Sequence, residues 1–468
     1  MKKLSYRYTD VSLLALLIIL FAVVYINLHY SNWKNPKNII VNEILSYYGY
    51  LPATFIYNDI TLEFIKQDRD KFKGKFWFTK SPTGNLILMT SCGMAVLYFP
   101  FFIVAHSVAE LMGYVADGYT LPYRLALVIS SIFYLMIGAV FLQKFLLKYF
   151  SKQIVAVTLL TTILATNLLW YVTLEPAMSH AYSFALISTF LFVIDRWFDH
   201  PSIKYTIYIG LLIGIISLIR PVNIMIVILL ILWKVISWGE LKSRILFFIE
   251  KWYLIVLMLV MFVVVWSPQL IYWKYVSGSF FYYSYPEDQS FFFLNPQLFN
   301  TLFSWRKGFF IYTPVMIFAF AGIGLLYKSK RGFFWPVLVY FIITWYIMSS
   351  WWSWWYGGSF GLRPLIDSYG VFSIGLAAFL TWVRKTARLK KTILLTLFIL
   401  SIMLSSWHFK RYRGGSIHWN SMTREAYFDS FWREKPSSDW YKKIRKPNGK
   451  LARKGIYKYD DETLIDNK

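Results

Sequence analysis

The 468-residue sequence has few charged residues, which make up 16% of the chain against 57% for hydrophobic residues. A soluble chain of this length carries more charge and spreads its apolar residues with an amphipathic period. Here the apolar residues form blocks that match the roughly 17–25 residues needed for one membrane-crossing helix. The scarcity of charge therefore excludes a soluble globular protein and predicts an all-α integral membrane protein.

Cysteine is almost absent, with Cys92 as its single occurrence. One cysteine excludes an internal disulfide and a cluster of thiolate ligands. Histidine and acidic residues are scattered too widely along the chain to indicate a closed metal site. We therefore predict no cofactor and no metal site, although the sequence does not exclude a divalent metal.

Acidic residues are also scarce, with 24 Asp and Glu against 49 Lys and Arg, so the net charge is +25. Such an excess is typical of nucleic-acid-binding proteins, but here the basic residues lie mainly between apolar blocks and in the C-terminal tail. Membrane orientation and contact with anionic head groups explain this placement better. The expected partner is thus the lipid bilayer and not a nucleic acid.

The first apolar block, residues 11–30, follows the basic start MKKLSYRYTD and precedes no small-residue cleavage site. Its length favours an uncleaved span with the N-terminus in the cytoplasm. The next two blocks, 86–111 and 123–143, do not both cross, because the lysines that follow the second would then lie outside, against the positive-inside rule. We therefore predict an interfacial helix at 86–111 on the outer face and the second span at 123–143.

With this choice the remaining blocks alternate across the bilayer, and the cytoplasmic turns hold basic runs such as RKTARLKK. The sequence predicts a membrane domain at 1–406, with interfacial helices in a first outer loop at 30–122. A short polar tail at 407–468 follows on the outer face, with one short helix after Thr423 and a flexible end. The polytopic bundle has about eleven predicted spans: 11–30, 123–143, 153–172, 178–194, 204–219, 221–236, 251–269, 310–326, 334–350, 368–383 and 391–406.

Ionisable residues are nearly absent from the interiors of the predicted spans and gather at their outer ends. Charges inside a membrane mark ion and proton pathways, and inverted repeats mark many transporters. The sequence offers neither feature. Its polar chemistry is instead expected at the outer interface, where a site takes one substrate from the membrane and another from the water side.

Three outer segments carry the motifs that matter most: NEILSYYGYLPA, GKFWFTKSPTGN and SSWWSWWYGGSFGLRPLID. With these segments in this order, the chain resembles the GT-C polyprenyl-phosphate-dependent glycosyltransferases, which include the aminoarabinose transferase and the protein O-mannosyltransferases. The resemblance covers roughly 10–430. It implies the GT-C fold, a polyprenyl-phosphate-linked sugar donor and an acceptor outside the cytoplasm.

The resemblance also implies roles for individual residues. An acidic pair in the first outer loop, followed by a tyrosine, corresponds here to Asn42-Glu43 and Tyr47. Because an asparagine cannot accept a proton at neutral pH, the role of the base falls on Glu43. A Lys-Pro-like motif before the surface helix corresponds to Lys80-Ser81-Pro82, and Arg124 opens the second span.

Cations in such an enzyme meet the charge that develops on the leaving phosphate. Lys80 is the first candidate for this role, followed by Arg220 of Arg220-Pro221 and by Arg363, because arginine grips phosphate with two hydrogen bonds. His180 and Asp59 are secondary catalytic candidates. Trp355 belongs to a tryptophan cluster that fits either an interface belt or a surface for stacking on a sugar.

We therefore predict an inverting membrane glycosyltransferase in a bacterial inner membrane, with its active site on the periplasmic face and a glycan, lipid or protein as acceptor. Two rivals stay open. An O-antigen-type polysaccharide polymerase or ligase relies on arginines in outer loops and not on Glu43. A non-enzymatic lipid-carrier flippase or transporter moves its substrate without forming a glycosidic bond.

Overall fold

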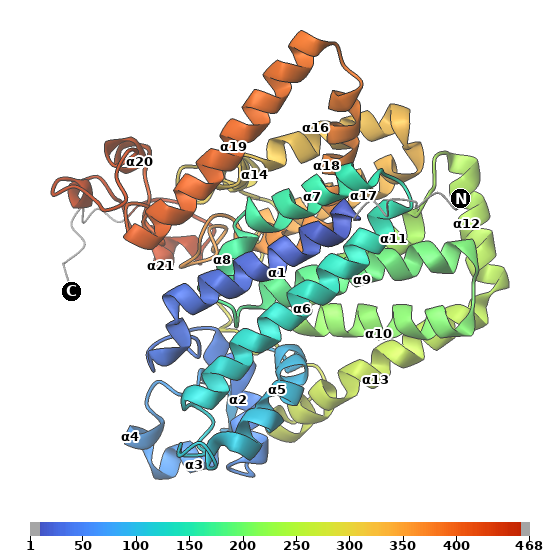
Figure 1. Ribbon diagram of the computed structural model, residues 1–468. Helices are drawn as coiled ribbons and strands as arrows, with labels where there is room; N and C mark the ends of the chain where they lie inside the picture. The colour runs from blue at the N-terminus through green and yellow to red at the C-terminus, as the bar shows by residue number, and fades with distance from the viewer. Residues whose placement is uncertain (1–9, 460–468) are drawn as a thin grey trace, which may run out of the picture.

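The computed structural model describes residues 10–459, so the basic residues of the expected cytoplasmic N-terminus and the last nine residues lie outside it. The described chain is mostly helical (Figure 1). Seven of its helices are long and apolar enough to cross a membrane, which supports an all-α integral membrane protein. These are α1 (Val11–Tyr30), α6 (Leu121–Leu147), α9 (Ser179–Asp199), α13 (Trp252–Ser277), α17 (Arg331–Ser349), α18 (Tyr369–Arg384, preceded by the 3₁₀ turn η3, Arg363–Ser368) and α19 (Arg388–Gly414).

Shorter apolar helices coincide with the four other predicted spans. Two of those spans are interrupted. Predicted span 153–172 is divided between α7 and α8, and 310–326 between α15 and α16, where Pro314 cannot continue a helix. The count of eleven spans stays a prediction. The shorter elements are α7 (Lys152–Leu164), α8 (Leu168–Thr173), α10 (Ile203–Ile219), η2 (Pro221–Ile226), α11 (Val227–Leu232), α15 (Phe309–Tyr312) and α16 (Met316–Ser329).

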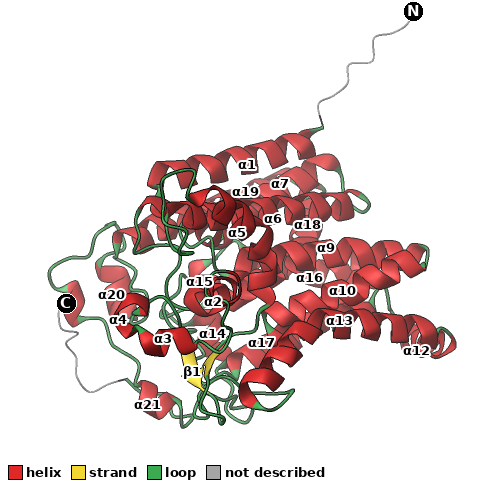
Figure 2. Ribbon diagram, turned by 90° about the horizontal axis from the view of Figure 1, so that it is seen from below, coloured by secondary structure: helices red, strands yellow, loops and turns green. Residues whose placement is uncertain are grey.

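The remaining elements lie at the two ends of the bundle. Segments α2 to α5 and the C-terminal α20 and α21 lie at one end, and α12 lies at the opposite end (Figures 1 and 2). The first loop and the tail thus share one end of the molecule. These elements are η1 (Asn32–Lys34), α2 (Ile44–Phe55), α3 (Glu63–Gln67), α4 (Arg69–Phe72), β1 (Phe78–Lys80), β2 (Leu86–Leu88), α5 (Gly93–Ala109), α12 (Trp238–Glu250), α14 (Leu298–Phe303), α20 (Arg424–Asp429), η4 (Trp440–Lys442) and α21 (Gly449–Ala452).

The prediction of one helix over 86–111 is wrong at its start. Leu86–Leu88 forms strand β2, which pairs antiparallel with β1, and the helix α5 begins only at Gly93. The turn between the strands closes with a hydrogen bond from Ser81 N to Asn85 O, and Gly84 adopts φ +87°. A short apolar run is compatible with either a buried strand or a helix. Here the turn brings residues 86–88 beside residues 78–80, so the run pairs as a strand.

The tail contains more helical structure than the one short helix that the sequence predicts. Helix α19 continues past residue 406 to Gly414, because its last polar side chains find partners in the tail: His408 Nε2 lies 2.7 Å from Tyr427 Oη, and Arg411 Nη2 donates to Tyr427 O at 2.8 Å. The short helix after Thr423 is confirmed, since the Thr423 side chain accepts from Ala426 N and caps α20. The described tail also contains η4 and α21 and buries Trp440.

Helices α16 and α18 cross at two glycines. A methyl group added at Gly322 would overlap the carbonyl oxygen of Gly375, whereas one added at Gly324, on the same helix, meets nothing within 4 Å. Small residues at a crossing let two membrane helices approach closely. The crossing therefore requires glycine at 322 and not at 324.

We predict that Gly322→Ala destabilises the protein by about 1–3 kcal/mol, because overpacking displaces backbone that cannot rearrange cheaply. Gly324→Ala is the matched control and is expected to be neutral or slightly stabilising, since alanine favours a helix by about 1 kcal/mol over glycine. Thermal unfolding of the two variants in detergent measures the difference. Equal melting temperatures for both would contradict this view of the crossing.

Candidate functional site

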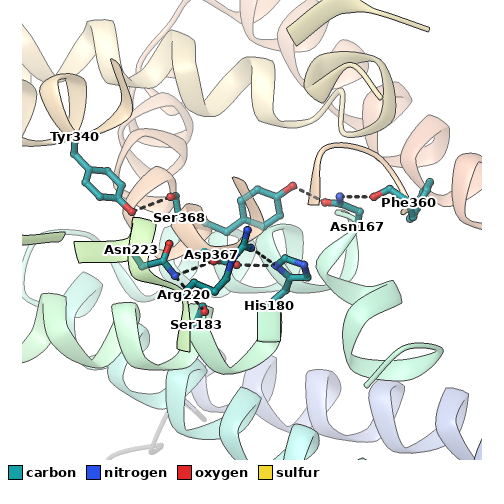
Figure 3. A network of polar contacts seen from close by, with 10 residues as sticks. Asn167, His180, Ser183, Arg220, Asn223, Tyr340, Phe360, Asp367 and Ser368 are labelled. Atoms are coloured by element: carbon teal, nitrogen blue, oxygen red, sulfur yellow. Dashed lines mark hydrogen bonds and ion pairs between the residues drawn. The ribbon is translucent and has the colours of Figure 1, made fainter. Parts of the chain in front are cut away.

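A buried carboxylate, Asp367, is the centre of a polar cluster at the loop-bearing end of the bundle (Figure 3). One oxygen accepts from Nδ1 of His180 at 2.8 Å. The other accepts from Nδ2 of Asn223 at 2.9 Å and lies 3.3 Å from Nη1 of Arg220. The cluster joins the start of α9, the junction of α10 with η2, and the turn η3. Three separate chain segments are thus fixed by one anion.

The contact with Asp367 sets the tautomer of His180. A carboxylate only accepts hydrogen bonds, so Nδ1 carries the proton and Nε2 presents its lone pair. His180 is 1% exposed, and no group within residues 10–459 hydrogen-bonds to Nε2. Buried polar atoms in proteins are nearly always paired. His180 therefore offers an acceptor that the described chain does not use.

The second feature of the site is an ion pair between Glu43 and Arg363, which lie 320 residues apart in the sequence. Glu43 stands at the N-terminus of α2 and is one third exposed, while Arg363 opens η3 and is nearly buried. Burial raises the pKa of Glu43, but the guanidinium of Arg363 outweighs this effect, and the pKa lies below its ordinary value of 4.5. Glu43 is therefore a carboxylate at neutral pH.

The structure gives a local reason for the asparagine that precedes Glu43. Asn42 is exposed and adopts φ +52°, a left-handed conformation that asparagine tolerates better than most residues. This left-handed residue comes just before the start of α2. Tyr47, one turn after Glu43, is buried and interacts electrostatically with the Glu43 carboxylate. Asn42 thus shapes the approach to the site, and Glu43 is its acid.

Arg220 keeps most of its donors free. Its side chain is 19% exposed, and within the described chain only Nη1 donates a hydrogen bond, to Asp367 at 3.3 Å. The same nitrogen lies 3.3 Å from Nδ1 of His180, which carries a proton and does not accept. Arg363, which faces Glu43, interacts electrostatically with Glu43, Tyr47 and His180. Two arginines with unused N–H groups and a carboxylate beside them can bind an oxyanion and orient a hydroxyl.

A further carboxylate and lysine extend the site. Burial raises the pKa of Glu175, which interacts electrostatically with Arg363, Lys307 and Glu43. Burial also lowers the pKa of Lys307 well below its usual range, and its Nζ donates to the carbonyl oxygens of Ser359 and Trp419. The two glutamates thus have pKa values shifted in opposite directions, a pattern that separates proton-donating from proton-accepting groups.

Of the predicted site residues, the structure brings Glu43, Tyr47, His180, Arg220 and Arg363 together. Lys80, at the end of β1, is exposed and forms no ion pair with any residue in 10–459. Asp59 accepts hydrogen bonds from Thr61 N at 2.9 Å and Phe64 N at 3.2 Å, which hold the turn before α3. Neither residue has a hydrogen bond that joins it to the cluster within the described chain.

Arg124 and Trp355 also lie apart from the cluster. Arg124 is buried and donates to Trp33 O at 2.7 Å and Tyr119 O at 2.6 Å, so it ties the start of α6 to the first loop. Trp355 packs against Trp354 and Ala452 of the tail. The contacts of Arg124 indicate a structural role at the same end of the molecule.

Sequence reasoning gave no role to Asp367 and Asn223. The sequence does contain a pattern that points to these two residues. An Arg-Pro pair precedes each of them: Arg220-Pro221 comes before Asn223, and Arg363-Pro364 comes before Asp367. In both, proline occupies the first turn of a 3₁₀ helix, where its missing N–H costs nothing. The polar residue then lies one turn beyond the arginine and faces the same cluster.

The position of Arg363 depends on a glycine in the preceding loop. Gly361 has φ +63°, and a side chain there would meet Tyr312 Cβ at 3.0 Å and Asn167 Nδ2 at 3.2 Å. Asn167 in turn donates to Phe360 O at 2.9 Å (Figure 3). The loop is thus pressed onto α8 and α15, and this contact fixes where η3 begins.

No protein-family model and no curated protein matches the chain. Among residues 10–459, no three side chains of His, Cys, Asp or Glu are grouped so that they could hold a metal ion. The prediction that no metal or cofactor is needed remains untested by this arrangement. The chemistry of the site is therefore argued from the arrangement of its own residues.

We predict that Asp367→Ala lowers the free energy of unfolding by about 3–5 kcal/mol, because it leaves the buried donors of His180 and Asn223 and the largely enclosed Arg220 without their anion. Asp199→Ala at the opposite end is the control: its carboxylate is 28% exposed beside Lys148 and Lys234, so the expected loss is about 1 kcal/mol or less. Chemical denaturation in detergent measures both. A loss for Asp367→Ala no larger than that for Asp199→Ala would contradict a central role for this carboxylate.

Proposed function

We propose that the protein is a GT-C-type membrane glycosyltransferase that transfers a sugar, with inversion, from a polyprenyl-phosphate donor to an extracytoplasmic acceptor. The observation that carries the proposal is the pairing of Glu43 with Arg363 beside the Asp367 cluster. The family resemblance assigns the acid and the phosphate-side cations to distant parts of the chain. Their convergence at one end of the bundle supports those assignments.

The chemistry needs one acceptor for a proton and cations for a leaving phosphate. The acceptor hydroxyl attacks the anomeric carbon from the face opposite the phosphate, and the bond from that carbon to the phosphate oxygen breaks. The electron pair leaves with the polyprenyl phosphate, whose new charge meets the free N–H groups of Arg220 and Arg363. The hydroxyl proton passes to the Glu43 carboxylate, which is exposed enough to reach an incoming acceptor.

His180 is the second group able to receive that proton. Its Nε2 lone pair has no partner among the described residues, and Asp367 stabilises the imidazolium that would form. This arrangement supports a role for His180 beside Glu43. Lys80, exposed at the end of β1, is a further proposed contact for the phosphate.

The proposal includes a bundle of about eleven spans in a bacterial inner membrane, with the site on the periplasmic face. The first loop and the tail share one end of the bundle (Figure 2). The first loop follows one span, so a tail on the same side of the membrane must follow an odd number of spans, as eleven is. Basic turns then lie in the cytoplasm, as the positive-inside rule favours. The site lies among the outer ends of the helices, where lipid-linked and water-soluble substrates meet.

We predict that the purified protein releases free polyprenyl phosphate from one member of a panel of polyprenyl-phosphate sugars. Glu43→Gln is expected to lower kcat about 10²-fold or more, the usual size of an acid–base contribution. Arg220→Gln is expected to lower it by a similar factor, because the leaving phosphate loses a cation. Release is measured by chromatography of the lipid product.

Glu63→Gln and Arg69→Gln are the matched controls, since both residues lie exposed in the same outer loop. Neither change should alter kcat by more than about twofold. Release that persists fully in Glu43→Gln while the arginine variants fail favours the polymerase or ligase alternative. Transport of a lipid-linked sugar in vesicles without any release favours the flippase alternative.

The pKa of Glu43 sets a second prediction. Because this pKa lies below 4.5 in the folded protein, the carboxylate persists as the pH falls through 4.5, and the acid limb of kcat/KM should lie below that value. Arg363→Gln removes the opposing charge, so burial then raises the pKa and the acid limb of the residual activity moves above 4.5. An acid limb that is the same in both proteins would show that Glu43 does not govern it.

A further inference from the structure

A cavity of about 460 Å³ lies between the loop around α14 and the C-terminal tail, apart from the ionic cluster. Its volume falls in the range of about 300–1,000 Å³ that is usual for small-molecule sites. Three cations line it, Arg306, Arg424 and Lys458, and no aspartate or glutamate of the described chain does. The charge of the lining is thus entirely positive.

Arg306 is the strongest sign that the cavity holds an anion. It is 6% exposed, and its hydrogen bonds run to two neutral carbonyl oxygens, those of Asn420 at 3.1 Å and Arg445 at 3.3 Å. No carboxylate within residues 10–459 forms an ion pair with it. A buried guanidinium without a counter-ion is costly, and an anion bound in the cavity would offset that cost.

The walls of the cavity are aromatic. Trp305, Trp354, Trp355 and Tyr457 line it, and the guanidinium of Arg306 lies 5.5 Å from the centre of the Trp355 ring. The hydroxyl of Tyr457 is buried and has no hydrogen-bond partner in the described part of the chain. Flat aromatic rings beside unused polar groups suit a ligand with an apolar face and a polar rim, such as a pyranose.

The cavity and the ionic cluster are connected through adjacent residues. Arg306 lines the cavity, while Lys307 interacts electrostatically with Arg363. Likewise Trp355 lines the cavity, while Tyr356 interacts electrostatically with Arg220 and Arg363. A ligand in the cavity would therefore lie next to the segments that form the proposed catalytic site.

We propose that this cavity binds an anionic sugar unit of the acceptor, carrying a carboxylate or a phosphate, and so selects acidic glycans. This inference rests on the proposed function, because it assigns a substrate class to the same enzyme. The carboxylate or phosphate meets Arg306, Arg424 and Lys458, and the pyranose ring packs on the tryptophans.

The test measures binding of three ligands to the full chain in detergent by isothermal titration calorimetry: a glucuronic-acid-containing disaccharide, the neutral disaccharide cellobiose, and glucose 6-phosphate. At least one acidic ligand should bind about tenfold or more tightly than cellobiose, as expected when one charged hydrogen bond is gained. The tighter of the two acidic ligands identifies the anion. Equal affinity for all three, or no binding of either acidic ligand, would overturn the proposal.

Two exposed cations allow a test that spares the fold. Arg424→Gln/Lys458→Gln should weaken acidic-sugar binding about tenfold. The control Arg433→Gln/Lys454→Gln removes the same charge from exposed residues outside the cavity lining and should change binding less than twofold. Equal weakening by the two double variants would overturn the proposal.

An anionic lipid is the competing occupant. If nanodiscs that contain phosphatidylglycerol bind the protein through Arg424 and Lys458, and both acidic sugars fail to bind, the cavity is a head-group site and the proposal is wrong. The release assay separates this result from the proposed function. Loss of release in Glu43→Gln with no sugar binding refutes only the cavity, whereas cavity-dependent sugar binding without any release refutes only the transferase.

Discussion

The buried carboxylate of Asp367 is the interaction on which the arrangement of the site depends. An anion without water must be surrounded by donors, and Asp367 obtains them from Arg220, Asn223 and His180. Those three donors belong to α9 and to the α10–η2 junction, while Asp367 belongs to η3. One charge therefore joins three helix ends that are distant in the sequence.

Arg363 gains its position from the same turn. It lies four residues before Asp367, at the start of η3, and the Gly361 loop presses that start against Tyr312 and Asn167. The arginine is then held where Glu43 of the first loop can pair with it. Removal of either partner would leave the other charge without its counter-ion. Glu43 is nevertheless one third exposed, so a substrate can reach it. Rigid support on one side and access on the other are what a catalytic carboxylate requires.

Much of this site could be predicted from helix-end positions. A residue that ends one apolar block and a residue that begins the next must lie at the same end of a bundle, which is why Arg220 and His180 were expected on one face. Glu43 and Arg363 followed from the family motifs and not from spacing. The seven long helices were predictable because blocks of that length and apolarity have no stable alternative in water.

Other parts could not be predicted, because they depend on partners that are distant in the sequence. The hairpin of β1 and β2 rests on one turn, and its apolar strand reads equally well as helix. The order of the tail rests on Arg411 and Lys307 donating to backbone carbonyls, and no sequence pattern reports which carbonyl a side chain reaches. Lys80 resembled a phosphate ligand by its motif, but strand pairing placed it in solvent.

The ionic cluster and the cavity differ in whether acidic side chains of the protein lie beside their basic residues. In the ionic cluster Arg220 and Arg363 face Asp367 and Glu43, so the cluster is balanced and its arginines are oriented by anions of the protein itself. In the cavity Arg306 donates to two carbonyl oxygens and lies over the ring of Tyr459, and among residues 10–459 no acidic side chain in the lining offsets the charge of Arg306, Arg424 and Lys458. A balanced site suits a reaction in which charge develops and departs, since its dipoles are already oriented. An unbalanced site suits a ligand that carries its charge permanently, so the division of charge between the two matches a division between a reacting phosphate and a bound acidic sugar.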